Sequence, residues 1–275
     1  MSSSKFSLGA AQIEGFVCPA CRSIDKDNHS KYHQCTICAT VSVPARRSYN
    51  YDNDYPADRG HFDPAVGRCK QITLASWIRR AGVSLKGLKV LEIGFGGAAT
   101  LSWMAQQDAI VHGQEVVNSN RDEAVRLGIP PARVKDTLDD FCGESFDLIL
   151  YLDVFEHILE PAAHLDQIGK LTHKGSRALV VLPVAESMSR LMLRSLWPHD
   201  LPDHWVFYSS AGLAKLWERF GWRRENVFYP WKFISVVTAA RHVAIKTRIS
   251  IPTLGLGNVG FWLNFGERAL VFERP

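Results

Sequence analysis

The chain has 275 residues, of which 46% are hydrophobic and 22% are charged, and its formal net charge is +4. These proportions are typical of a globular protein that buries a sizeable core. No long basic run indicates nucleic-acid binding, and no apolar stretch reaches the roughly 18 residues that a membrane span needs. The N-terminal segment MSSSKFSLGAAQ also lacks the basic region and apolar core of a secretory signal, so we expect a cytoplasmic protein.

Four of the six cysteines lie near the N-terminus in two CxxC pairs, separated by thirteen residues: Cys18, Cys21, Cys35 and Cys38. Two residues between cysteines allow both thiolates of a turn to face one tetrahedral ion, and two such turns complete a four-sulfur shell. The alternative, a redox or disulfide pair, is less favoured because the spacing is doubled. The pattern predicts a structural zinc ion in a small module at residues 1–45.

Residues 46–275 are expected to form the main domain, which begins with a linker and a helix from Ala65 to Gly82. The segment VLEIGFGGAAT, Val90 to Thr100, then reads as a buried strand that turns through glycines into a helix. Glycines at 94, 96 and 97 carry no Cβ, so a ligand can approach the backbone and the amino end of the helix closely. This pattern predicts a nucleotide-type binding site, although dinucleotide enzymes, methyltransferases and ordinary turns all contain it.

Two acids follow at the ends of the next two predicted strands. Glu115 ends the strand AIVHGQEV, about twenty residues after Gly94, where a carboxylate can accept hydrogen bonds from both ribose hydroxyls. Asp136 ends a brief third strand and is a candidate for contact with an adenine amino group. A solvated charge at a strand end is the simpler interpretation of Glu115, but the order of glycine turn, helix and acid favours a cofactor site.

A fourth strand lies in FDLILYLDVFEHILEP, where an apolar run ends in three polar residues, Asp153, Glu156 and His157. Ligands of open parallel sheets bind at the carboxyl ends of the strands, so this cluster is expected beside the glycine turn. Helices and strands continue to alternate to a helix that ends at Gly221, and runs at 226–228, 233–239 and 268–272 are expected to close the sheet edge. The sequence predicts an α/β fold: a Rossmann-like, doubly wound, mostly parallel seven-stranded sheet.

The segment from about 185 to 210 contains methionines and aromatic residues mixed with His199, Asp200, Asp203 and His204. Apolar side chains with a few polar groups are typical of small-molecule pockets, so this segment is predicted to form a substrate cap.

Together these segments resemble the class I S-adenosylmethionine-dependent methyltransferases of small-molecule type. LEIGFGGA is similar to the first motif of that group, and FDLILYLDVFEHILEP to its fourth-strand segment. The match covers roughly residues 88–222, and the cysteine-rich head resembles a bacterial subgroup acting on sugars, lipid-linked glycans or other secondary metabolites. One departure is Ala98, which stands where the first motif usually has its third small residue, next to Gly97.

The resemblance implies methyl transfer from S-adenosylmethionine to a small-molecule acceptor, with a hydroxyl of a sugar, glycan precursor or secondary metabolite favoured. A base must then remove the hydroxyl proton, and histidine suits this role at neutral pH. The candidates are His157 and His204, each of which has a structural interpretation as a helix cap or a backbone-bonded side chain. The implied cofactor contacts are Glu92, Gly94, Gly96, Gly97, Glu115, Asp136 and Asp153.

Several alternatives remain open. A zinc module ahead of this domain also resembles certain ribosomal-RNA methyltransferases, but the weak basicity makes nucleic acid an unfavoured partner. Two further alternatives are a non-catalytic S-adenosylmethionine-binding protein and an enzyme in which Glu156 and His157 hold an assisting metal ion. A homodimer is compatible with the sequence.

Overall fold

A central seven-stranded sheet organises the chain in the computed structural model, which describes residues 16–25, 32–43, 62–237, 239 and 259–275. The sheet order is β11-β14-β9-β8-β5-β6-β7. The bounds of these strands are β5 (Lys89–Ile93), β6 (Ile110–Gln114), β7 (Val134–Lys135), β8 (Phe146–Leu152), β9 (Thr172–Pro183), β11 (Arg223–Phe228) and β14 (Glu267–Glu273). Five strands, β5 to β9, pair in parallel, and β14 joins β9 antiparallel. The predicted doubly wound, mostly parallel sheet is therefore confirmed.

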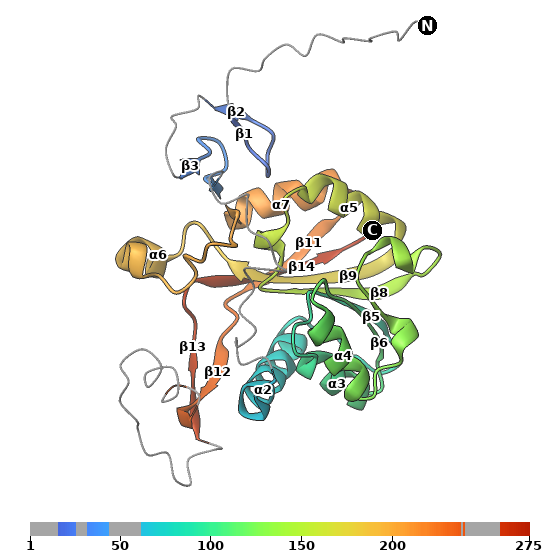
Figure 1. Ribbon diagram of the computed structural model, residues 1–275. Coiled ribbons are helices and arrows are strands. Elements are labelled where there is room, and N and C mark those ends of the chain that lie inside the picture. The colour runs from blue at the N-terminus through green and yellow to red at the C-terminus, as the bar shows by residue number, and fades with distance from the viewer. Residues whose placement is uncertain (1–15, 26–31, 44–61, 238, 240–258) are drawn as a thin grey trace, which may run out of the picture.

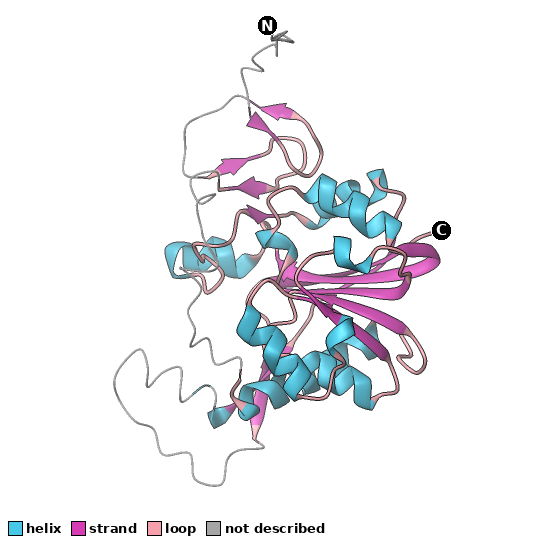
Figure 2. Ribbon diagram, turned by 45° about the vertical axis from the view of Figure 1, so that its right-hand side comes forward, coloured by secondary structure: helices cyan, strands magenta, loops and turns pink. Residues whose placement is uncertain are grey.

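Helices cover both faces of this sheet (Figures 1 and 2). One face carries α2 (Pro64–Arg80), α3 (Ala99–Gln106) and α4 (Asn118–Arg126), and the other carries α5 (Pro161–Lys170) and α7 (Ser210–Arg219). Apolar residues on both faces of the central strands explain the two layers, since a parallel sheet is covered on both sides. Along β8, alternate residues enter different cores: Ile149 packs toward α5 and α7, and Leu150 toward α2 and α3.

The cysteine-rich head contains four short strands, β1 (Phe16–Val17), β2 (Ile24–Asp25), β3 (His33–Gln34) and β4 (Val41–Ser42). It lies above α7 in Figure 1, and Cys18 and Cys38 are buried in the same apolar cluster as Trp217 of that helix. Gly212 of α7 allows this close approach, because a Cβ there would meet Thr40 Oγ1 at 2.3 Å. The boundary expected between residues 45 and 46 falls outside the described residues.

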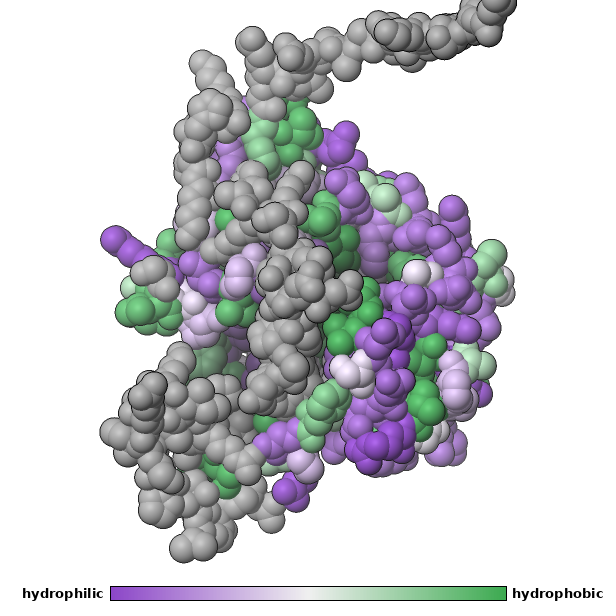
Figure 3. All heavy atoms as spheres, viewed as in Figure 1, coloured by the Kyte–Doolittle hydropathy of each residue, from purple (hydrophilic) through white to green (hydrophobic). Residues whose placement is uncertain are grey.

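The segment predicted as a cap contains α6 (Met188–Leu193) and the strand β10 (Val206–Phe207), which pairs antiparallel with β4 of the head. A short 3-10 turn, Arg194–Leu196, follows α6. Apolar side chains are exposed over α6, which lies at the left in Figure 3, among them Met188, Leu191 and Met192. The segment predicted to form the cap is thus attached to the head by a short pair of strands.

One expectation about the last strands is wrong. The run near residue 233 forms β12 (Lys232–Ser235), which does not close the sheet edge but pairs with β13 (Gly260–Leu263) in a separate two-stranded ribbon. The ribbon leaves the sheet and lies against α2, where the N–H of Phe233 donates to Thr73 Oγ1 at 2.9 Å. The runs at 226–228 and 268–272 do join the sheet. No helix among the described residues is long and apolar enough to cross a membrane.

Candidate active site

The glycine turn lies between β5 and α3, at the carboxyl edge of the sheet. Gly94 and Gly96 have left-handed φ values of 63° and 58°, which explains the glycines there. Ala98 also takes a left-handed φ, 58°, as the residue before α3. The departure from the usual motif thus falls where the chain enters the helix, at a conformation that side chains seldom adopt.

Glu92, near the end of β5, is buried. Its Oε1 accepts a hydrogen bond from Thr100 Oγ1 at 2.7 Å, while the buried Oε2 has no hydrogen-bond partner among the described residues. Burial raises the pKa of Glu92 to about 8, although the Thr100 hydroxyl and Lys70 oppose the shift. The positive charge of Lys70, on α2, is the one that opposes this shift, and burial lowers the pKa of Lys70 itself.

Glu115 follows β6 and contacts the glycine turn directly. Its Oε2 accepts the N–H of Gly96 at 2.9 Å and its Oε1 accepts the N–H of Val117 at 3.0 Å. Asp136, after β7, is exposed, and its carbonyl accepts a hydrogen bond from Gln114 Nε2 at 2.7 Å. The two predicted acids therefore follow neighbouring strands, with Glu115 buried against the turn and Asp136 facing solvent.

Asp153 follows β8, next to β5 in the sheet, and has a left-handed φ of 58°. Its Oδ2 accepts a hydrogen bond from Lys232 Nζ at 2.7 Å, and its N–H donates to the carbonyl of Val181 at 2.8 Å. The buried Oδ1 has no hydrogen-bond partner among the described residues. Two buried carboxylate oxygens at this edge, on Glu92 and Asp153, thus remain for hydrogen-bond donors of a ligand.

The two predicted bases come together although they lie far apart in the sequence. The rings of His157 and His204 have their centroids 4.6 Å apart, edge to face. The Nδ1–H of His157 donates to the carbonyl of Asp203 at 2.7 Å, since a carbonyl only accepts, and Nε2 is therefore the basic nitrogen of the neutral ring. The side chain of His157 is 17% exposed, whereas that of His204 is 4% exposed.

Glu156 lies under this histidine pair and is fully buried. Burial, and after it the nearby Asp153 carboxylate, raises the pKa of Glu156 well above its usual range. Its Oε1 is 4.0 Å from His204 Nε2. Three possible metal-ligand atoms, one each from Glu156, His157 and His204, lie within 4.8 Å of one another. These side chains therefore form a group that could hold a metal ion.

The four cysteines of the head form a second group of this kind. Cys18 Sγ lies 3.6 Å from Cys38 Sγ, and Cys21 Sγ lies 3.6 Å from Cys35 Sγ. Zinc–sulfur bonds of 2.3 Å in a tetrahedron place neighbouring sulfurs about 3.8 Å apart, so the observed spacing fits zinc. All four thiols are free of disulfides. The predicted four-cysteine zinc shell is supported by this geometry.

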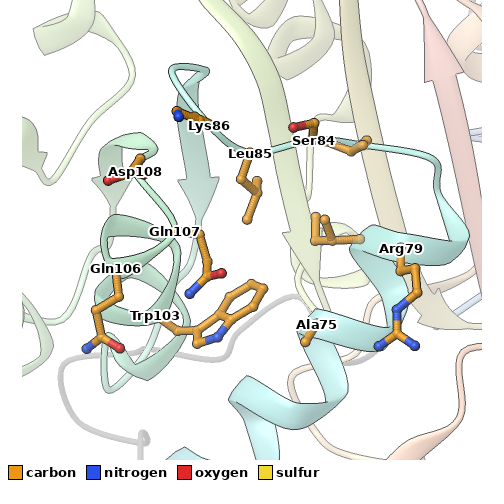
Figure 4. A pocket seen from close by; sticks show the side chains of 11 residues that line it. Ala75, Arg79, Ser84, Leu85, Lys86, Trp103, Gln106, Gln107 and Asp108 are labelled. Atoms are coloured by element: carbon orange, nitrogen blue, oxygen red, sulfur yellow. The ribbon is translucent and has the colours of Figure 1, made fainter.

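A hollow of about 470 Å³ lies elsewhere, between the ends of α2 and α3 and the loop before β5 (Figure 4). Trp103, Gln106 and Arg79 are among the side chains around it. It opens at the amino ends of the strands, whereas ligands of open α/β sheets bind at the carboxyl ends. It is therefore not the candidate active site.

Comparison with known proteins decides the family. Residues 70–226, more than half of the chain, match the family described as "Methyltransferase domain". The chain belongs to this family. The glycine turn, Glu115 and Asp153 after β8 all lie at the carboxyl edge of the sheet, where ligands of open α/β sheets bind. The protein is an S-adenosylmethionine-dependent methyltransferase, and the buried carboxylate oxygens described above fit the ammonium group of that cofactor.

Two relatives of this methyltransferase share the name ubiquinone biosynthesis O-methyltransferase. The one from Aeromonas salmonicida is 25% identical over 159 residues, which are 53% of this chain and 67% of the relative. The one from Xylella fastidiosa strain M23 is 27% identical over 176 residues, 57% of this chain and 71% of the relative.

Solved methyltransferase structures are similar to this methyltransferase. A Bacillus halodurans structure named for methyltransferase activity superposes with a TM-score of 0.51 at 15% identity, over 74% of this chain and 98% of that one. Magnesium protoporphyrin IX methyltransferase of Synechocystis, with SAH bound, gives a TM-score of 0.49 at 17% identity, over 76% of this chain and 84% of that one. At 15% identity, the Bacillus halodurans match bears on the fold alone.

Sequence reasoning missed the cations of the site. Lys70 comes from α2 and Lys232 from the β12–β13 ribbon, and neither belongs to a motif. Glu267, which also contacts Lys232, is the first residue of β14. Only the tertiary contacts identify these residues, although an ionisable residue inside a largely apolar run, as in YPWKFIS, is a weak signal of a buried ion pair.

Proposed function

We propose that this methyltransferase acts on a hydroxyl group of a small molecule. The observation that carries the proposal is the pairing of His157 and His204 next to the acidic end of β8, where the cofactor edge and the cap meet. The relatives' printed names support transfer to oxygen. They favour biosynthesis of a ubiquinone-type compound over the sugar or secondary-metabolite acceptor expected from the cysteine-rich head.

In the proposed reaction, bound S-adenosylmethionine supplies an electrophilic methyl group on a sulfonium ion. His157 removes the proton of the acceptor hydroxyl at Nε2, while the carbonyl of Asp203 fixes its ring and tautomer. The Asp203 carboxylate, with Oδ2 3.7 Å from Nδ1, stabilises the imidazolium that results. His204 packs against His157 and orients it, and the cap aligns the acceptor and excludes water.

On the cofactor side, we assign the ribose hydroxyls to Glu115, the ammonium group to Glu92 and Asp153, and the carboxylate to Lys70. The glycine turn, including Gly97, would allow close approach of the backbone, and we assign the adenine amino group to Asp136. Residues 1–45 are proposed as the zinc module and 46–275 as the methyltransferase domain. The paired thiols support a cytoplasmic location, and a homodimer is a proposal that light scattering can test.

The decisive experiment measures methyl transfer from labelled S-adenosylmethionine to a panel of catechols, other phenols, hydroxylated quinone precursors, nucleotide sugars, amines and carbon acids. Product from a catechol or quinone precursor, lost in Glu115→Ala, supports the proposal. Product only from an amine or a carbon acid contradicts it. Calorimetry that detects no S-adenosylmethionine binding would instead favour a non-binding scaffold, and binding without turnover of any acceptor would favour a non-catalytic protein.

Two alternatives have their own tests. A gel shift with ribosomal RNA at low salt tests the RNA hypothesis, which the net charge of +4 disfavours. For a metal held by Glu156, His157 and His204, activity should fall on chelation at a concentration that leaves the cysteine-bound zinc in place, and Mg²⁺ or Mn²⁺ should restore it. Activity that is insensitive to chelation supports His157 as a base that acts without a metal ion.

A further inference from the structure

One lysine connects three parts of the chain at the candidate site. Lys232 Nζ lies 2.7 Å from Asp153 Oδ2, after β8, and 2.9 Å from Glu267 Oε1, at the start of β14. Lys232 itself is the first residue of β12, in the ribbon that lies outside the main sheet. Its ammonium group therefore joins the ribbon to the strand ends that carry the site.

Glu267 extends this contact to the cap. The same Oε1 lies 3.1 Å from His199 Nε2, while Oε2 accepts the N–H of Phe265 at 2.8 Å. Glu267 is 1% exposed. A line of polar contacts thus runs from His199 in the cap through Glu267 and Lys232 to Asp153.

The charges on this line are mutually dependent. A buried carboxylate is stable only when it is paired, and Lys232 and His199 lower the pKa of Glu267 despite its burial. Removing Lys232 would leave two carboxylates, Asp153 and Glu267, without their shared cation. Such a change is expected to alter the position or protonation of both groups.

Asp153 has features of a side chain that is held in place for a ligand. Its φ of 58° lies in the left-handed region, which side chains seldom adopt. Lys232 binds Oδ2, whereas Oδ1 is buried and has no hydrogen-bond partner among the described residues. One oxygen is thus fixed by the protein and the other remains for a donor.

We propose that Lys232 is a positioning residue of the methyltransferase. It fixes Asp153 for the cofactor, and it couples the position of the cap, through His199 and Glu267, to cofactor binding at Asp153. This inference rests on the proposed function, because it takes the carboxyl end of β8 as part of the cofactor site. It assigns no chemical step to Lys232. Its consequence is that cofactor affinity depends on cap residues, such as His199, to which we assign no contact with the cofactor.

The first test compares Lys232→Met and Lys232→Arg in the full-length, zinc-loaded protein. Calorimetry gives the Kd for S-adenosylmethionine, and steady-state assays give the KM for cofactor and acceptor. We expect Lys232→Met to raise the cofactor Kd at least tenfold and Lys232→Arg to keep it within threefold of the wild type. The acceptor KM should change less than the cofactor KM.

Lys89→Met is a matched control. The Lys89 side chain is 27% exposed against 25% for Lys232, and it also pairs with a carboxylate, that of Glu144, but at the amino end of β5. This variant should bind S-adenosylmethionine like the wild type. Equal losses of affinity in the Lys232→Met and Lys232→Arg variants, in proportion to their losses of Tm, would show a merely structural lysine and overturn the proposal.

The second test measures the coupling between His199 and Asp153, which do not contact each other directly. The Kd for S-adenosylmethionine is measured for His199→Asn, Asp153→Asn and the double variant, with Lys232 present and in Lys232→Met. The two effects should deviate from additivity by at least threefold when Lys232 is present and be additive without it. Additivity in both backgrounds would refute the proposed coupling of His199 to Asp153 through Lys232.

These outcomes separate the inference from the proposed function. If the wild type binds no S-adenosylmethionine, the proposed function fails and the inference fails with it. If the wild type binds and Lys232→Met binds equally well, only the inference fails. Should Lys232→Met not fold, His199→Asn alone decides: an unchanged cofactor Kd overturns the proposal, and a raised Kd with an unchanged Tm supports it.

Discussion

Glu115 accepts a hydrogen bond at 2.9 Å from the backbone N–H of Gly96, so the acid that follows β6 holds the glycine turn that follows β5. The second oxygen of Glu115 accepts the N–H of Val117. A residue predicted only as a ribose ligand therefore also shapes the glycine turn. Loss of Glu115 is expected to act on binding and on stability together.

The Glu115→Gln variant tests this double role. An amide has one acceptor oxygen, so one of the two backbone N–H groups loses its partner, at a cost of about 1 to 3 kcal/mol in the free energy of unfolding. The Kd for S-adenosylmethionine should rise at least about tenfold. Urea unfolding and calorimetry measure the two effects. Glu123→Gln, on α4, removes only the pair with Arg126 and should change neither; an unaltered Kd in Glu115→Gln would contradict the assignment.

The His157→Ala variant tests the proposed base. Because general-base catalysis contributes about 10²- to 10⁴-fold, kcat should fall at least about a hundredfold while the KM for S-adenosylmethionine changes little. The pH–rate profile of the variant should lose the limb that reports histidine ionisation. His204→Asn should lower kcat less, since that side chain positions His157. The exposed His173, at the other end of the sheet, is the control. Should His204→Asn lose more activity than His157→Ala, the two roles are reversed.

The cysteine shell predicts one zinc ion per chain. Cys21→Ser should lower the zinc content measured by mass spectrometry and reduce the Tm, because the buried cysteines share an apolar cluster with α7. Cys142→Ser, at an exposed cysteine outside the shell, should retain both zinc and Tm. Zinc retained in full by Cys21→Ser would argue against the four-sulfur site.

The pKa of Glu92 predicts a specific dependence of stability on pH. It is about 8 in the folded protein and near 4.5 in the unfolded chain, so between these values the folded state binds more protons. The free energy of unfolding therefore receives a contribution that is complete below pH 4.5 and is lost as the pH rises through 8.

Glu92→Gln cannot ionise, so its stability relative to the wild type should increase across this window, by about 1 kcal/mol for each pH unit. Urea unfolding at a series of pH values measures the difference. Glu144 provides the comparison, because Lys89 lowers its pKa and its carboxyl is ionised in both states over the same window. The curve for Glu144→Gln should run parallel to that of the wild type. A parallel curve for Glu92→Gln would disprove the prediction.

The sequence by itself determined the features that depend on local pattern. Apolar strands followed by helices predict a sheet covered on both faces, and glycines at 94 and 96 are needed where the backbone takes a left-handed φ. The doubled CxxC spacing likewise predicts the sulfur cluster, since both thiols of a pair come from one turn. These inferences hold because chain neighbours produce the geometry.

The tertiary structure decided what depends on contacts between distant segments. His157 and His204 were separate candidates, and only the pairing of β4 with β10 and the placement of the cap bring their rings together. The Lys232–Asp153 contact joins residues 79 positions apart. The strand β12 pairs with β13 outside the sheet, where Lys232 binds Asp153 and the N–H of Phe233 binds Thr73 of α2. Ion pairs and strand partners of this kind depend on distances in space that residue spacing does not encode, so sequence pattern alone leaves them undetermined.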